Sequence, residues 1–302
     1  MMVISRPFGR EDDLFRLKQL VTACMSSDMQ YSFWHVGDLV WGMYQNTLFD
    51  PRQNVRLWEN EAGELIGFAW REKHGTGMQA APQHRHDSEL PGQMVAWGEV
   101  CQREAVAQEG AEPVYTVSAF EDNFPLLNLL AQQGFQRDEF YMLHMCRDLS
   151  QPIPEAKLPE GWVVRAVGGE DEFEQRVNIH REVWHPSKVT LEAYRRMRGI
   201  AGYTPECDFV VVAPDGTFAS YCICWLDPVS KIGEFEPVGT RAAFRGKGLG
   251  KALMLHALRR LHAHGMETAI VCCVGSNEPA WRLYESVGFQ TYNRSFDYSK
   301  RL

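Results

Sequence analysis

Three glycines alternate with other residues in the segment Arg245-Gly-Lys-Gly-Leu-Gly-Lys251, which also carries three cationic side chains. Residues without a Cβ let successive backbone N–H groups converge on an anion. A predicted helix follows at once, so its N-terminus adds partial positive charge to the full charges of Arg245, Lys247 and Lys251. The pattern predicts a loop that binds phosphate or pyrophosphate. The alternative is a basic surface turn without a ligand.

Two common nucleotide-binding loops do not fit this segment. A Walker A loop needs a Ser or Thr where Ala252 stands, and the glycines read GxGxG rather than the dinucleotide pattern GxGxxG. A P-loop nucleotide hydrolase is therefore disfavoured. The eight cysteines and ten histidines show no metal-ligand spacing. No metal site is predicted, and the cysteines are expected to be reduced and buried.

The strand expected before the loop, Glu234-Phe-Glu-Pro-Val-Gly-Thr240, carries two carboxylates. Glu234 and Glu236 are two residues apart, so they should share one face of a sheet. Pro237 cannot donate a ladder hydrogen bond, which favours a bulge or a strand that splays from its neighbour. Either glutamate could take a proton from an attacking amine, or both could be ordinary solvated strand residues.

Alternating strands and helices are expected to position these residues. Apolar periodicity and turn chemistry predict an α/β fold with a mixed sheet. The predicted strands cover 162–167, 208–213, 218–226, 232–239, 269–274 and 289–299, and the predicted helices cover 170–184, 191–199, 250–264 and 279–287.

The chain of 302 residues is about twice the usual domain size, and its two halves match each other. Residues 6–14 match 165–173 at four of nine positions, and residues 123–136 match 277–290 at six of fourteen. Prolines at 152, 154 and 159 favour an extended connection between the copies. The predicted organisation is therefore one domain at 1–150, a linker at 151–160 and a second domain at 161–302.

Residues 233–290 resemble the core of the GNAT superfamily of N-acetyltransferases. Arg245, Gly248 and Gly250 match the family motif R-x-x-G-x-G/A, and Asn277 with residues 282–289 matches its second signature. The duplication is similar to that of tandem GNAT proteins of the mycothiol synthase type. The resemblance implies two tandem GNAT-like domains, each a mixed, mostly antiparallel twisted sheet flanked by helices.

The resemblance also implies that acetyl-CoA is the cosubstrate and that a splayed strand holds its pantetheine arm. The Val238 N–H is then a candidate donor to the thioester oxygen. Asn277 would contact the cofactor, although it could equally cap the helix beginning near Pro279. The cofactor-binding residues expected on this basis are Val238, Gly239, Thr240, Arg245, Gly246, Lys247, Gly248, Leu249, Gly250, Lys251 and Asn277.

The resemblance assigns a general acid to Tyr284, whose phenol could protonate the CoA thiolate as it leaves. The alternative for Tyr284 is core packing. Glu236 is favoured over Glu234 as the base, because it lies closer to the expected thioester position. The predicted catalytic residues are Tyr284, Glu236 and Glu234, and no covalent nucleophile is required.

The first copy departs from this pattern. Residues 82–93 keep Arg85 but lack the glycines and add Asp87 and Glu89, whose charges would repel phosphate. Leu130 stands at the position that matches Tyr284. The first domain is therefore expected to have lost acetyl-CoA binding and to form one wall of the acceptor cleft. Four tryptophans are candidates for the core or for that wall: Trp34, Trp41, Trp70 and Trp97.

The predicted function is acetyl-CoA-dependent transfer of an acetyl group to a primary amine of a small molecule or peptide. The alternative is a non-enzymatic acyl-CoA sensor or interaction module. A net charge of −8 argues against nucleic-acid binding and fits a cationic amine. The sequence shows neither a membrane-spanning apolar run nor a secretory signal, so a cytoplasmic protein without a membrane partner is expected. The oligomeric state is left open, with a homodimer as one option.

Overall fold

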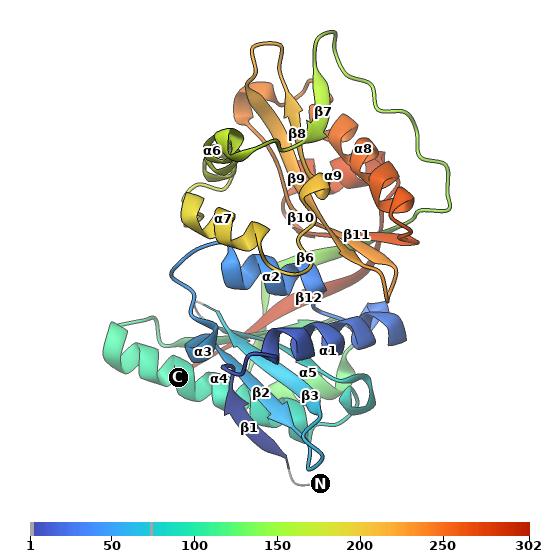
Figure 1. Ribbon diagram of the computed structural model, residues 1–302. Coiled ribbons are helices and arrows are strands. Elements are labelled where there is room, and N and C mark those ends of the chain that lie inside the picture. Colours follow the sequence, from blue (N-terminus) through green and yellow to red (C-terminus); the bar gives the residue numbers. More distant parts are fainter. Residues whose placement is uncertain (1–2, 73–74) are drawn as a thin grey trace.

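The computed structural model describes residues 3–72 and 75–302 of the chain, which form an α/β fold (Figure 1). The helices are α1 (Asp13–Ser27), α2 (Val36–Tyr44), α3 (Pro51–Asn54), α4 (Glu89–Glu109), α5 (Phe124–Gln132), α6 (Phe173–Val183), α7 (Leu191–Arg198), α8 (Leu249–Ala263) and α9 (Glu278–Ser286). The strands are β1 (Ile4–Pro7), β2 (Val55–Glu59), β3 (Leu65–Arg71), β4 (Gly75–Ala80), β5 (Val114–Phe120), β6 (Gln136–Asp148), β7 (Val163–Ala166), β8 (Asp208–Val212), β9 (Phe218–Asp227), β10 (Ile232–Thr240), β11 (Thr268–Val274) and β12 (Gln290–Arg301).

The elements predicted for the second half are confirmed, with ends that differ by a few residues. The largest difference lies in the helix predicted for 170–184. Residues 170–172 form a 3₁₀ turn and α6 begins only at Phe173. The fold class, a mixed and mostly antiparallel sheet flanked by helices, is also confirmed. Within the described residues only the pairs β4–β5 and β10–β11 are parallel.

All strands of the described residues belong to one continuous sheet, in the order β1-β2-β3-β4-β5-β12-β6-β11-β10-β9-β8-β7. The last strand of each half therefore pairs with the other half. β6 is antiparallel to β11, with Met142 opposite Val274, and β12 is antiparallel to β5, with Arg301 opposite Val114. This exchange brings the C-terminus to the end of the molecule that holds the first half (Figure 1).

The internal repeat appears in the contacts as well as in the sequence. Arg6 pairs with Asp13 at 2.6 Å, and Arg165 pairs with Glu172 at 2.5 Å, at matching positions of the two copies. Asn123 caps α5 and Asn277 caps α9, each by accepting a backbone hydrogen bond at 3.4 Å. Matching residues of the two copies, identical or as similar as Asp13 and Glu172, thus perform the same local structural task.

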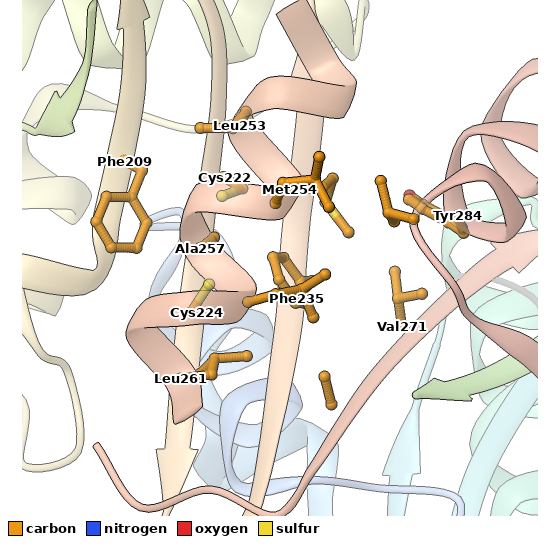
Figure 2. Packing of buried hydrophobic residues seen from close by; sticks show 14 of the residues in the cluster. Phe209, Cys222, Cys224, Phe235, Leu253, Met254, Ala257, Leu261, Val271 and Tyr284 are labelled. Atoms are coloured by element: carbon orange, nitrogen blue, oxygen red, sulfur yellow. The ribbon is translucent and has the colours of Figure 1, made fainter. Parts of the chain in front are cut away.

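The core of the second half lies between α8 and the sheet (Figure 2). Leu253, Met254 and Ala257 of α8 face buried strand residues that include Phe235, and Tyr284 of α9 joins the same cluster. Burial of this apolar surface stabilises the helix on the sheet. Because α8 follows the glycine segment directly, the packing also fixes where that segment lies.

Residues 151–162, which include the predicted linker, form no helix or strand. Ile153, Ala156 and Leu158 nevertheless pack against the core of the second half. Among the helices described, none combines the length and apolar character required to cross a membrane.

Helix α2 of the first half packs against the second half, where it contacts α7, β9 and β10. Trp41 of α2 belongs to the same buried cluster as Tyr194 and Trp225. In Figure 1 this helix lies between the two halves, above α1 and beside α7. It therefore places first-half side chains next to the strand that carries Glu234 and Glu236.

Candidate active site

The glycine segment forms a tight turn into α8. Gly246 and Gly248 have φ angles of 76° and 75°, a left-handed conformation that side chains with a Cβ rarely adopt. Gly248 is also the N-cap of α8, which begins at Leu249. The backbone N–H groups at this helix end therefore face an open space without side-chain obstruction.

Three cations surround that helix end. Arg245, Lys247 and Lys251 are all exposed, and none of them forms an ion pair within the described residues. Their charges are available to an anionic ligand, and the helix N-terminus adds to their field. The arrangement is able to hold a phosphate or pyrophosphate group.

A cavity of about 460 Å³ opens beside this loop. Every residue predicted to bind the cofactor lines it except Lys247, whose Nζ lies 5.2 Å from the centre of the Phe244 ring. Tyr284 lines the same cavity from α9. The structure thus brings the phosphate loop, strand β10 and Tyr284 together around one space.

Strand β10 bends where Pro237 interrupts it. Its register with β9 shifts between Phe235 and Val238, and its pairing with β11 covers only residues 232–234. Beyond Glu234 the two strands separate, which confirms the splay expected from Pro237. The indole of Trp225 donates a hydrogen bond of 2.6 Å to the Glu236 carbonyl and holds the bulge in place.

A second cavity, of about 370 Å³, lies on the other side of this bulge. Glu236 and Pro237 line it from β10, and Trp41, Gln45 and Asn46 line it from the first half. Trp184, which is 49% exposed, lines both cavities. A ligand in the second cavity would therefore meet a ligand in the first along Trp184 and β10.

The two glutamates of β10 have different surroundings. Glu234 is buried, and its Oε2 lies 3.0 Å from Nδ1 of His35. Glu236 is partly exposed in the second cavity, and burial together with the charge of Glu234 raises its pKa to about 8. A carboxylate with this pKa is suited to take a proton near neutral pH. Of the two predicted bases, Glu236 is the one that lines a cavity and can be reached by an amine.

Tyr284 is 6% exposed, and its hydroxyl has no hydrogen-bond partner among the described residues. Burial raises the pKa of Tyr284 well above its ordinary value, with smaller contributions from Cys273 and Glu236. The phenol is therefore protonated throughout the neutral range and can donate its proton into the cavity. Its ring also packs 6.1 Å from that of Phe289, so Tyr284 contributes to the core, and its role as general acid stays a prediction.

Most of the side chains that line the second cavity were not expected from the sequence, and His180 and Trp184 are the two aromatic ones among them. His180 is buried, and burial followed by the charge of Arg176 lowers its pKa to about 3. Its Nδ1 lies 2.7 Å from the Tyr221 hydroxyl, and its ring stacks with Trp184. The four-residue spacing of His180 and Trp184 along one helix face is the signal that could have identified them.

The equivalent cavity of the first half is only about 50 Å³. Arg85 is paired with Asp28 at 3.2 Å, and Asp87 accepts the Glu89 N–H at 2.8 Å, which places a carboxylate at the start of α4. Leu130, the counterpart of Tyr284, is buried in the core. A helix end already occupied by a carboxylate has little capacity for a phosphate.

The four tryptophans considered for the acceptor wall divide between two environments. Trp41 lines the second cavity. Trp34 and Trp70 stack on each other in the first-half core, and Trp97 packs against Trp58. All eight cysteines are free thiols, and burial raises the pKa of Cys272 and Cys273 at the site, which disfavours the thiolate form of a nucleophile.

The sequence of this region was compared with the models of known protein families. The sequence model of the acetyltransferase (GNAT) family matches residues 173–289. The second half of the chain therefore carries the sequence pattern of a GNAT acetyltransferase. Members of this family use acetyl-CoA, which agrees with the loop and cavity of the matched region.

Related sequences cover more of the chain. The mycothiol acetyltransferase of Saccharomonospora viridis is 26% identical over 80% of this chain and 81% of its own length. That of Thermomonospora curvata is 32% identical over 61% of this chain and 63% of its own length. Both are named for the same reaction class, acetyl transfer.

Solved structures share the whole fold. A GCN5-related N-acetyltransferase from Sphaerobacter thermophilus has a TM-score of 0.69 and 21% identity, covering 99% of this chain and 95% of its own. A tandem GNAT protein from the clavulanic acid biosynthesis pathway has a TM-score of 0.68 and 14% identity, covering 99% and 98%. The tandem GNAT fold predicted from the repeat is thereby confirmed.

Proposed function

We propose that the second half, residues 161–302, binds one acetyl-CoA and transfers its acetyl group to a primary amine held between the halves. The observation that supports this most is the meeting of two cavities at Trp184 and β10. One cavity carries the phosphate loop and Tyr284, and the other carries Glu236 and the side chains of α2. The two domains, 1–150 and 161–302, then have separate tasks joined by the segment 151–160.

In the proposed reaction the amine nitrogen bonds to the acetyl carbon and its proton passes to Glu236. The carbon–sulfur bond then breaks, and the thiolate of CoA takes the phenolic proton of Tyr284. Donors along β10, the Val238 N–H among them, stabilise the oxyanion that forms between these steps. The backbone from Arg245 to Lys251 holds the pyrophosphate, and Asn277 caps α9 at the wall of the same cavity.

The acceptor is proposed to be a cationic amine. Glu236 faces the second cavity, and Asp38 and Glu234 lie within electrostatic reach of it. Lys188 is the lysine of the cavity lining, and the three carboxyl groups outnumber it. They favour an ammonium group beside Glu236, where the proton must be removed. Eight free thiols also agree with a reducing compartment, and we place the reaction in the cytoplasm.

A panel of amines tested for release of free CoA examines this function directly. The panel should contain polyamines, aminoglycosides, amino sugars and peptides with free N-termini. We expect release that depends on both acetyl-CoA and one class of amine, with the acetylated amine detected by mass spectrometry. Binding of acetyl-CoA without turnover of any amine would instead support a sensor or interaction module.

A further inference from the structure

A buried histidine of the first half contacts the strand that carries the proposed base. His35 immediately precedes α2 and is fully buried. Its Nδ1 lies 3.0 Å from Glu234 Oε2, and its Nε2 lies 3.2 Å from the Ile232 carbonyl oxygen. Both partners belong to β10, so the first half reaches the catalytic strand through one imidazole ring.

The contacts of this ring indicate where its protons lie. A carbonyl oxygen only accepts hydrogen bonds, so Nε2 must carry a proton toward Ile232. The Gly37 N–H lies 3.1 Å from Nδ1, where it can share the lone pair of a ring that is unprotonated at this nitrogen. A carboxylate oxygen at 3.0 Å from the same nitrogen requires a proton between them, on the carboxyl group or on the ring. In both cases the His35–Glu234 pair holds one proton and has no net charge.

The pair lies among acidic groups. The titratable side chains that act on Glu234 or His35 come from four elements: Asp38 of α2, Glu236 of β10, Cys272 of β11 and Tyr292 of β12. Within the described residues, no lysine or arginine pairs with Glu234, Glu236 or Asp38. Carboxylates without a cation in a buried space repel each other, and one of them retains a proton unless another base holds it.

The packing around the pair requires a glycine. A Cβ on Gly37 would lie 2.4 Å from Glu234 Oε2 and 2.4 Å from Cγ of Trp225. The backbone N–H of His35 also donates to Asp38 at 2.8 Å and fixes the start of α2. The contact between His35 and Glu234 therefore depends on a close approach of the helix to β10.

We propose that His35 is a positioning residue for the transfer reaction, acting through Glu234. It shares one proton with Glu234 and so weakens, without removing, the field of the Glu234 carboxylate at Glu236. Glu236 is then free to take the proton of the amine. The inference rests on the proposed function, because it concerns the base of that reaction.

The substitution His35→Asn tests the inference. Asparagine places an amide donor near the position of Nδ1, so it keeps a hydrogen bond to Glu234 without a titratable ring. Without the imidazole, the protons shared among Glu234, Glu236 and Asp38 reside on these carboxyl groups. A higher pH is then needed to deprotonate Glu236. We expect the acidic limb of the kcat/KM profile to move up by about one pH unit and activity near pH 7 to fall roughly tenfold. The affinity for acetyl-CoA should not change.

His144→Asn is the matched control. His144 is buried, hydrogen-bonded to Ser295 at 2.9 Å, and burial lowers its pKa to about 4, so it holds no charge near neutral pH. Its pH profile should coincide with that of the wild type. If the profile of His35→Asn also coincides with the wild type, or moves to lower pH, the inference is wrong.

A measurement that needs no turnover separates this inference from the proposed function. In ¹⁵N-histidine NMR, the His35 signal is assigned by its loss in His35→Asn. We expect a protonated Nε2 at neutral pH and an Nδ1 resonance that shifts in Glu234→Gln. An Nδ1 resonance indifferent to Glu234→Gln would overturn the inference, whereas a wild type without turnover would overturn only the proposed function.

Discussion

Glu236→Gln should lower kcat/KM for amine acetylation by about a hundredfold to ten-thousandfold, the usual range for loss of a general base. Glutamine keeps the shape of the side chain in the second cavity but cannot accept the proton of the amine. Acetyl-CoA affinity should be retained, because Glu236 lies outside the first cavity. Steady-state kinetics and calorimetry measure the two effects separately.

The pH profile makes this prediction more specific. Burial and the charge of Glu234 raise the pKa of Glu236 to about 8, so the base is protonated and inactive at lower pH. The wild-type rate should therefore rise with pH, reach half its maximum near pH 8 and level off about one unit higher. The variant should lack this limb when assayed with the same amine. Glu182→Gln, on the far side of α6 and paired with Arg241, is the matched surface control. A variant at position 236 with the wild-type rate and profile would exclude Glu236 as the base.

Tyr284→Phe should lower kcat by roughly a hundredfold and leave the affinity for acetyl-CoA almost unchanged. The phenol is a neutral acid at the wall of the first cavity, and its hydroxyl has no hydrogen-bond partner within the described residues. Phenylalanine preserves the ring that packs against Phe289. The fold should therefore remain intact, as thermal unfolding of the variant can verify.

A change of acyl donor distinguishes a general acid from a packing residue. If Tyr284 protonates the leaving thiolate, the deficit of the variant should shrink with an acetyl thioester whose leaving thiol is more acidic. A deficit of equal size with both donors would indicate that the tyrosine acts only by packing.

The second half was predictable because its local patterns agree with its tertiary structure. The alternation in β10, the periodicity of α8 and the glycines at positive φ all act within a few residues of each other. The exchange of β6 and β12 between the halves was not predictable. The alternation of a strand specifies which face is buried, but not which neighbour it pairs with.

The contacts between the two halves could not be predicted from the sequence either. His35 and Glu234 are 199 residues apart in the chain. Locally, His35 and Asp38 form a capping box, a pattern that indicates only the start of a helix. That Trp41 lines the second cavity became clear only once the position of α2 on β10 was known.

Calorimetric titration with acetyl-CoA tests the central claim, that one half of this duplicated chain holds the cofactor. We predict one equivalent bound per chain in the wild type and in Arg85→Ala, which changes the reduced cavity of the first half. Gly248→Val should abolish binding, because valine cannot adopt the φ angle of 75° at the N-cap of α8 without strain. Two equivalents per chain, or binding that survives Gly248→Val and is lost in Arg85→Ala, would contradict the account.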